Sequence, residues 1–243
     1  MEYDYYPEEE PKKKSPVLAV LKYAVIALVI VVYALMIFRI AIKEDPKSAK
    51  EFIWTESSVA AYNESSGEFR VQNQQIRSFS YIDPVTGEAT KLVYNTITDD
   101  GYFQISSFMY VEATKELILT FRYNNASLEF LKQEYGLSQL PEGELYYLAL
   151  NTSKGRVTEY TYTSSARFTY EYRRVIFENV DLSQEKTLDL DIYFMGDIDL
   201  DRPLASLTVY DYRIPVEYYD LKDALPAKIN EGLKKSPYVP DGE

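Results

Sequence analysis

The most constraining feature of the chain is one long apolar segment near its N-terminus. Residues 17–42 read VLAVLKYAVIALVIVVYALMIFRIAI, and the stretch from Tyr23 to Phe38 contains 16 residues without a charge. A bilayer core needs about 20 residues of helix, and Lys22 and Arg39 at the two flanks can extend their charged ends to the lipid headgroups. The segment therefore predicts a single transmembrane helix over residues 17–42.

A signal peptide, a buried helix and a lipid anchor fit this apolar segment less well. A cleaved signal peptide has an apolar core of about 7 to 15 residues that ends in a small-x-small site, whereas this longer core ends in the bulky sequence MIFR at residues 36–39. A buried helix that is apolar on every face would need a very large soluble core. A lipid anchor on cysteine is excluded because the chain has no cysteine.

The orientation of the predicted span does not follow from its flanking charges. Four basic residues stand on each side, namely Lys12, Lys13, Lys14 and Lys22 before it and Arg39, Lys43, Lys47 and Lys50 after it. The chain instead has the build of a signal-anchor, with a tail of 16 residues before the span and about 200 residues after it, and long domains cross largely regardless of their charge. We therefore expect a single-pass protein of the cell membrane with a cytoplasmic N-terminus and an extracytoplasmic C-terminal domain.

Cysteine and histidine are both absent from the 243 residues. Their absence excludes disulfides, nucleophiles or bases of either type, Ser-His-Asp relays, and ordinary zinc, copper or haem sites. Carboxylate, lysine, tyrosine and serine chemistry remains possible, and we expect no cofactor. A domain of this size can fold without disulfides, and the lack of cysteine fits a bacterial envelope better than an animal cell surface.

The negative charge is concentrated after the apolar segment. The whole chain carries −12, with −2 on residues 1–16 and +3 on residues 17–50, which leaves −13 on residues 51–243. This charge argues against nucleic acid as a partner. It would also repel anionic lipid or wall polymer unless cations bridge them.

The remaining sequence divides into a tail, a connector, a main domain and a C-terminal segment. Residues 1–16 are charge-blocked and predict a disordered tail, for which a docking peptide with Tyr3, Tyr5 and Tyr6 as anchors is the alternative. Residues 43–66 predict a partly helical connector, in which Trp54 either lies at the lipid interface or caps the domain's core. Residues 67–218 predict an extracytoplasmic β domain, and residues 219–243 a partly helical tail broken near Pro226.

Alternation of apolar and polar residues dominates the main domain. Nine segments read as strands: RSFSYI, KLVYNTI, YFQISSFMYV, ELILTFRY, ELYYLAL, RVTEYTYT, RFTYEYRRVIF, TLDLDIYFM and LASLTVYDYRI. Turn residues separate several of them, at 83–87, 99–101 and 153–155. One helix interrupts them at ASLEFLKQEYG, with Asn125 as N-cap and Gly136 at its end, and is expected to cross between two antiparallel sheets.

Four of these segments carry a resemblance: DDGYFQISSFMYV, ELILTFRYNNASLEFL, FTYEYRRVIFENVDL and LDLDIYF. Together they resemble the immunoglobulin-like β-sandwich domains of membrane-anchored, largely uncharacterised envelope proteins of Gram-positive bacteria, over roughly residues 95–214. The resemblance implies an antiparallel sandwich and supplies no catalytic residue. The intersheet cysteine pair and packed tryptophan of antibody-type domains are missing.

Three groups of residues are candidates for a function. Asp197, Asp199 and Asp201 extend an acidic series that begins at Asp189, and they are calcium candidates although the EF-hand pattern is broken at Arg202. The tyrosines Tyr160, Tyr162, Tyr170 and Tyr172 are candidates for an exposed row that stacks on sugar or contacts protein, although most tyrosines are expected to be core. Carboxylate pairs suited to glycoside hydrolysis are possible, but no spacing singles one out.

The sequence therefore predicts a mainly β protein, an immunoglobulin-like antiparallel β-sandwich with one short crossover helix, preceded by a transmembrane helix. We expect a non-enzymatic interaction or structural module at the cell envelope, whose partners are the lipid bilayer and an envelope protein. A carbohydrate-binding module for cell-wall glycan and a carboxylate-based hydrolase are the alternatives. An exposed tyrosine row would favour the first, and a deep acidic cleft the second.

Overall fold

The computed structural model of the chain describes residues 16–43, 51–65, 69–74, 78–82, 89–93, 102–220 and 232–237. The chain divides into two compact units, Met1–Glu44 and Asp45–Glu243. The tail predicted at residues 1–16 lies outside the described residues except for Pro16. The turns predicted at 83–87 and 99–101 lie outside them entirely.

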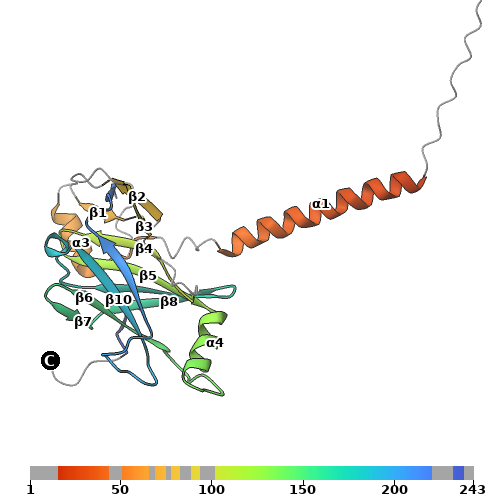
Figure 1. The fold of residues 1–243 in the computed structure, drawn as a ribbon. Coiled ribbons are helices and arrows are strands. Elements are labelled where there is room, and N and C mark those ends of the chain that lie inside the picture. The colour runs from red at the N-terminus through yellow and green to blue at the C-terminus, as the bar shows by residue number, and fades with distance from the viewer. Residues whose placement is uncertain are drawn as a thin grey trace, which may run out of the picture. The chain divides into compact units, whose positions relative to one another are not determined.

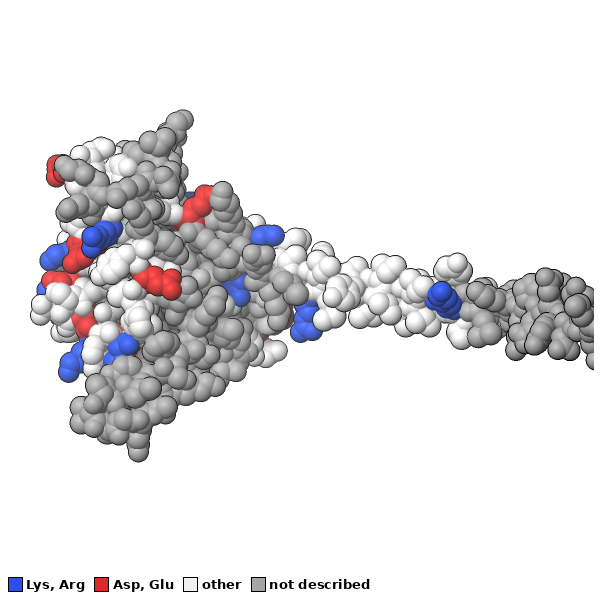
Figure 2. All heavy atoms as spheres, turned by 90° about the horizontal axis from the view of Figure 1, so that it is seen from above, with Lys and Arg blue, Asp and Glu red and all other residues white. Residues whose placement is uncertain are grey.

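The first unit contains the predicted apolar helix, α1, over Pro16–Lys43. Its stretch from Val20 to Arg39 comprises 20 residues with a mean hydropathy of 2.6, long and apolar enough to cross a membrane. The large apolar side chains described between Val20 and Phe38 are exposed. Figure 2 shows the middle of this helix without acidic or basic side chains on the visible face, which agrees with Lys22 and Arg39 as its charged flanks.

The second unit is mainly β, as predicted. Its helices are α3 (Glu56–Glu64), α4 (Asn125–Glu134) and the 3-10 helix η1 (Leu182–Gln184). Its strands are β1 (Arg70–Asn73), β2 (Ser78–Ile82), β3 (Ala89–Val93), β4 (Phe103–Val111), β5 (Glu116–Asn124), β6 (Tyr146–Thr152), β7 (Gly155–Val157), β8 (Thr161–Arg167), β9 (Tyr170–Phe177), β10 (Thr187–Phe194), β11 (Ala205–Asp211), β12 (Glu217–Asp220) and β13 (Lys234–Lys235).

Two antiparallel sheets pack face to face (Figure 1). The larger sheet has seven strands in the order β12-β1-β4-β5-β9-β8-β13, and the smaller has four in the order β11-β10-β6-β7. Strands β2 and β3 pair as a separate hairpin. The predicted antiparallel sandwich is therefore confirmed.

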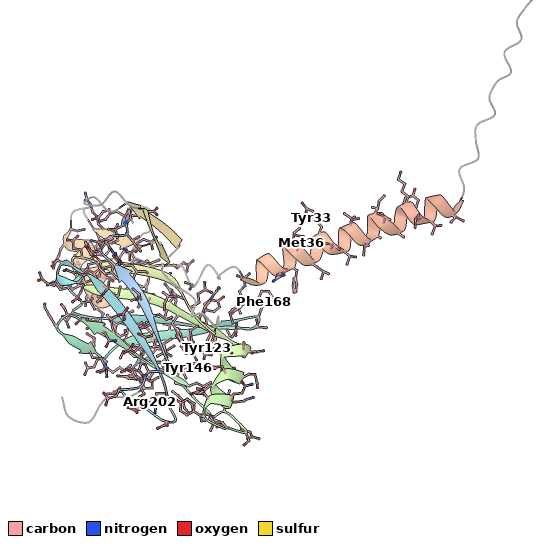
Figure 3. All side chains as sticks on the ribbon, viewed as in Figure 1. Tyr33, Met36, Tyr123, Tyr146, Phe168 and Arg202 are labelled. Atoms are coloured by element: carbon pink, nitrogen blue, oxygen red, sulfur yellow. The ribbon has the colours of Figure 1, made fainter. Side chains whose placement is uncertain are left out.

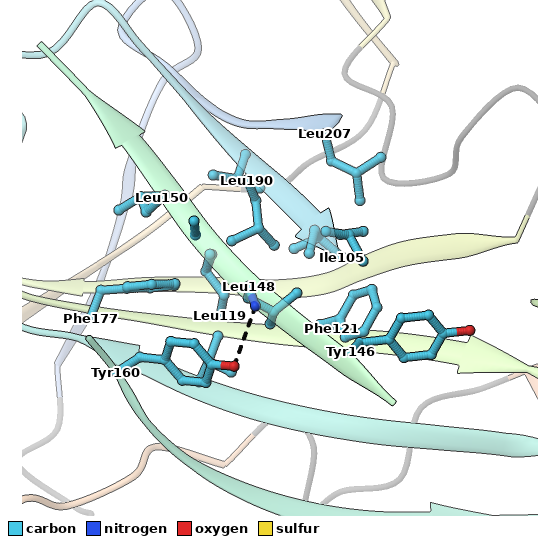
Figure 4. Close-up of a cluster of buried hydrophobic side chains, with 14 of the residues drawn as sticks. Ile105, Leu119, Phe121, Tyr146, Leu148, Leu150, Tyr160, Phe177, Leu190 and Leu207 are labelled. Carbon is cyan, nitrogen blue, oxygen red and sulfur yellow. Dashed lines mark hydrogen bonds between the residues drawn. The ribbon is translucent and has the colours of Figure 1, made fainter. Parts of the chain in front are cut away.

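The alternation in the strands decides which side chains fill the space between the sheets. Leu119 and Phe121 of β5 lie in one buried cluster with Leu190 of β10 (Figure 4). Leu117, Leu188 and Ile192, two residues away along these strands, belong to the same cluster. Successive residues of a strand point to opposite faces. The alternation of leucine and aspartate in the β10 segment therefore indicates correctly which of its faces is apolar.

Helix α4 connects β5 of the larger sheet to β6 of the smaller one, so the predicted crossover helix is confirmed. Its N-cap is Asn124 rather than the predicted Asn125, because the Asn124 Oδ1 accepts hydrogen bonds from the backbone N–H groups of Ala126 and Ser127, at 2.9 and 3.2 Å. Gly136 follows the helix with φ of 60°, which supports its predicted role at the helix end.

The larger sheet is covered on both faces. The face away from the smaller sheet carries a second buried cluster, to which Ile53, Trp54 and Phe69 contribute together with side chains of β1, β4, β5 and β9. The predicted connector thus includes the helix α3 and is packed onto the sandwich. As a consequence, eight of the nine residues of β5 are buried.

Two parts of the sequence-based fold need correction. RVTEYTYT, predicted as one strand, divides into β7 and β8, because the chain passes there from the smaller to the larger sheet. Lys234 and Lys235, placed in a C-terminal helix, form β13, whose residues pair with Tyr162 and Thr161 of β8. The rest of that predicted helix, including its break near Pro226, lies outside the described residues.

Candidate functional site

The four candidate tyrosines are not an exposed row. Tyr160, Tyr162 and Tyr172 are buried, and Tyr170 is half-buried. The two pairs also point to opposite faces of the larger sheet, since Tyr162 pairs with Val175 on the inner face whereas Tyr172 pairs with Arg122 on the outer face. The prediction that these rings could form one platform for sugar or protein is wrong, because both faces of this sheet are covered.

Tyr160 has a structural role at the edge of the smaller sheet. Its hydroxyl accepts a hydrogen bond from the Leu148 backbone N–H at 3.3 Å (Figure 4). Leu148 lies on β6 beyond the residues that pair with the short strand β7. The phenol therefore satisfies a buried backbone donor that no strand reaches, and burial raises the pKa of Tyr160 well above its usual range.

One end of the space between the sheets contains a small polar cluster. The Arg173 Nε donates to the Glu144 Oε2 at 2.8 Å, and another guanidinium N–H donates to the Tyr123 hydroxyl at 3.0 Å. Burial, followed by the nearby Glu144 charge, raises the pKa of Tyr162 to about 12. Tyr123 and Tyr146 lie beside each other there, with ring centroids 4.7 Å apart (Figure 3). The free space is about 10 Å³, enough for about one water molecule, so this cluster closes the core and leaves no room for a ligand.

Sequence analysis missed this cluster, although one signal for it was present. Arg173 and Arg174 are consecutive in β9, so their side chains must point to opposite faces of the sheet. Arg173 faces the core and is paired with Glu144. Arg174 faces the connector, is 7% exposed, and has its pKa lowered to about 10 by burial.

Arg174 holds the beginning of the connector on the sheet. Its guanidinium donates a hydrogen bond to the backbone carbonyl of Glu51. The negative charge of Glu51 also acts on this guanidinium and opposes the lowering of its pKa by burial. The residue therefore binds the main chain at the first described position after α1, twelve residues beyond Arg39.

The rest of the connector is fixed by an aromatic cluster and a buried carboxyl. Trp54 contacts three rings, those of Phe52, Tyr62 and Phe69, at centroid distances of 4.8, 5.3 and 5.8 Å. Thr55 is the N-cap of α3, and its hydroxyl donates a hydrogen bond to the Oε1 atom of Glu116 on β5 at 2.7 Å. The prediction that Trp54 caps the domain's core is confirmed.

Glu116 makes the attachment of the connector dependent on pH. It is 1% exposed, and burial raises the pKa of its carboxyl above the usual value. A raised folded-state pKa means that the unfolded chain ionises first, so stability is lost as the pH rises from the unfolded pKa through the folded pKa. Glu116→Gln removes this loss, and we expect the variant to gain more stability relative to the wild type at pH 7 than at pH 4.

Thermal unfolding at the two pH values measures this difference. The amide that Glu116→Gln introduces still offers an acceptor to Thr55, whereas Glu116→Leu removes the acceptor and should lower the free energy of unfolding by about 1–3 kcal/mol at both pH values. The exposed Glu129→Gln is the matched surface control. An equal shift for Glu116→Gln at pH 4 and pH 7 would contradict the assignment.

A second cavity of about 250 Å³ lies near the C-terminal end of β9, the end away from the turn that joins β8 and β9. Its lining residues are Thr152, Lys154, Gly155, Arg156, Val157, Asn179, Val180, Asp181 and Glu185. The acids already have partners, since Glu185 accepts from the Ser153 N–H and hydroxyl at 2.9 and 2.8 Å, and Asp181 lies 3.3 Å from the Lys115 Nζ. Two basic and two acidic side chains line this cavity, so it is not an acidic cleft.

The acidic series is not gathered into one site. Asp191 is buried on β10 and accepts hydrogen bonds from Asn151, Ser206 and Tyr193 at 2.6, 2.6 and 3.2 Å. The calcium candidates Asp197, Asp199 and Asp201 are all exposed, and Asp199 accepts a hydrogen bond from the Asp201 backbone N–H at 3.0 Å. Within the part of the chain that the structure describes, no group of three or more acidic side chains could hold a metal ion.

No protein-family model, curated protein or solved structure matches the chain. The fold and its side-chain contacts are therefore the basis for a functional proposal.

Proposed function

We propose that the protein is a membrane-anchored, extracytoplasmic β-sandwich that acts as a non-enzymatic interaction or structural module at the cell envelope. In this proposal α1 spans the membrane, with Lys22 and Arg39 at its ends, and the sandwich contacts a neighbouring envelope protein. Two observations support the proposal. Among the described residues, one helix is long and apolar enough to cross a membrane, and the domain that follows it is mainly β.

The attachment of the connector to the sandwich is the observation that carries the proposal. The chain is bound at Glu51 by Arg174, buried at Ile53 and Trp54, and bound again at Thr55 by Glu116. Glu51 is twelve positions after Arg39, so covalent geometry limits the distance between their Cα atoms to about 40 Å for any arrangement of the helix and the sandwich. A domain with so short a tether is suited to partners in or next to the membrane.

The charge of the domain favours a protein partner over a polyanion. Residues 51–243 carry −13, so nucleic acid and anionic wall polymer are disfavoured over most of its surface. The signal-anchor build of the chain supports the extracytoplasmic orientation. We do not propose the glycan-binding alternative, because three of the four candidate tyrosines are buried. We do not propose the hydrolase alternative, because the cavity of about 250 Å³ is lined by two basic and two acidic side chains.

Crosslinking in cells tests this proposal. A photo-crosslinking amino acid is placed at Lys154 or Tyr212, both exposed on the sandwich, and at buried Leu190 as a control. We expect the exposed positions to capture one or a few defined envelope proteins, identified by mass spectrometry, and Leu190 to capture none. Capture of only lipid and other copies of this chain at both exposed positions would contradict an interaction role.

A further inference from the structure

The turn between β8 and β9 combines two unfavourable features at one residue, Phe168. Its φ is 55°, in the left-handed region where a two-residue hairpin turn normally has glycine. Its side chain is 61% exposed, and the residue lies at the end of the hairpin (Figure 3). A bulky residue at positive φ is an outlier, and strained residues of this kind persist where the surrounding structure holds them and cluster at functional sites.

One basic side chain, that of Arg167, lies beside this aromatic tip, although the domain as a whole is acidic. The segment Thr161–Phe177 carries a net charge of +2 within a region that carries −13, and Arg167 is the arginine of this segment at the tip, since Arg173 and Arg174 bind Glu144 and Glu51 further along β9. The Arg167 guanidinium lies 5.4 Å from the centre of the Phe168 ring, and the Arg122 guanidinium lies 4.8 Å from that of Tyr170. The exposed Phe168 ring beside the Arg167 guanidinium matches a lipid interface, where the ring enters the acyl boundary and the guanidinium meets phosphate.

The same hairpin receives the chain that follows the apolar helix. Arg174 of β9 binds Glu51, and Arg174 is six positions after Phe168, which is about 20 Å along an extended chain. The connector then runs along the sheet away from the tip, because Thr55 binds Glu116 at the far end of β5. Glu51, where the described connector begins, therefore lies closer to the tip of the hairpin than Thr55 does.

From these observations we infer that the tip of the β8–β9 hairpin is a lipid-contact site. Phe168 inserts into the headgroup and acyl boundary of the bilayer that holds α1, and Arg167 binds lipid phosphate. This contact would fix the orientation of the sandwich on the membrane surface. The inference rests on the proposed membrane anchoring and adds a second point of attachment to it.

The absence of native cysteine permits a direct test with single labels. Full-length Thr169→Cys and, as a control at a similarly exposed aromatic position, Tyr212→Cys carry an environment-sensitive fluorophore; Tyr212 is 59% exposed on a different turn. Both proteins are reconstituted into vesicles of phosphatidylcholine and phosphatidylglycerol that contain spin-labelled lipid. We expect at least about twofold stronger quenching at Thr169→Cys, and loss of that difference when Phe168→Ser is added.

A second variant separates lipid contact from folding. Phe168→Gly relieves the backbone strain, so the thermal midpoint should rise by about 2–4 °C while the quenching at position 169 falls to the control value. Retained quenching in Phe168→Gly, or equal quenching at the two labelled positions in the parent protein, would overturn the inference. Flotation of the vesicles on a density gradient tests membrane anchoring separately. If no variant floats with the vesicles, the proposed anchoring is wrong; if the variants float but position 169 is not quenched, only the lipid contact of the tip is wrong.

Discussion

Replacing Trp54 with alanine should lower the free energy of unfolding by about 3–5 kcal/mol, the usual result of deleting a large buried aromatic ring. Trp54 is 3% exposed and contacts the rings of Phe52, Tyr62 and Phe69. Its loss would leave a cavity over Ile118 and Ile176, on the outer face of the larger sheet. Chemical denaturation of the full-length protein in detergent micelles measures the change.

Trp54→Phe is the matched control, because it keeps a ring in the cluster and should lose less stability than Trp54→Ala. The competing interpretation, a tryptophan at the lipid interface, predicts weaker membrane association with unchanged stability of the sandwich. A Trp54→Ala variant that unfolds within about 0.5 kcal/mol of the wild type would contradict the packing of the connector, since surface substitutions usually fall in that range.

Two arginines in the middle of α1, Val29→Arg together with Val32→Arg, should move the protein from the membrane fraction to the aqueous fraction. Each arginine at the centre of a span disfavours insertion by about 2.5–3.5 kcal/mol. The segment from Val20 to Arg39 has no other charge between Lys22 and Arg39, so nothing within it can pair with the added charges. Alkaline extraction of membranes followed by immunoblotting measures the distribution.

Val29→Leu together with Val32→Leu is the control for this experiment, since it changes the same positions and keeps the segment apolar. The leucine variant should remain with the membrane as the wild type does. Retention of the double arginine variant after alkaline extraction would show that α1 is not what attaches the protein.

Local patterns were sufficient to predict most of the fold. Apolar residues two apart identified the strands of the sandwich, and the leucine–aspartate alternation of β10 predicted its buried face. The short amphipathic segment ASLEFLKQE was correctly placed as the helix that crosses between the sheets. Its one-residue error at the N-cap arose because Asn124 and Asn125 are both good caps, and only the backbone geometry distinguishes them.

The candidate site was harder to predict because alternation does not reveal which face of a strand is covered. Tyr172 points away from the smaller sheet and would be exposed in a simple two-layer sandwich, yet it is fully buried. The covering of the outer face comes in part from Trp54 and its neighbours, more than a hundred residues earlier in the chain. Such long-range packing leaves little local signal, and the positive φ of Phe168 leaves none.

Cysteine labelling in intact cells tests the central claim of a membrane-anchored, exported sandwich most directly. Single Lys154→Cys and Ser15→Cys variants, on the sandwich and in the tail, are exposed to a membrane-impermeant maleimide before and after lysis. We predict that Lys154→Cys is labelled in intact cells and that Ser15→Cys is labelled only after lysis. Labelling of Ser15→Cys alone in intact cells would contradict the orientation, and protection of both positions until lysis would contradict export of the sandwich.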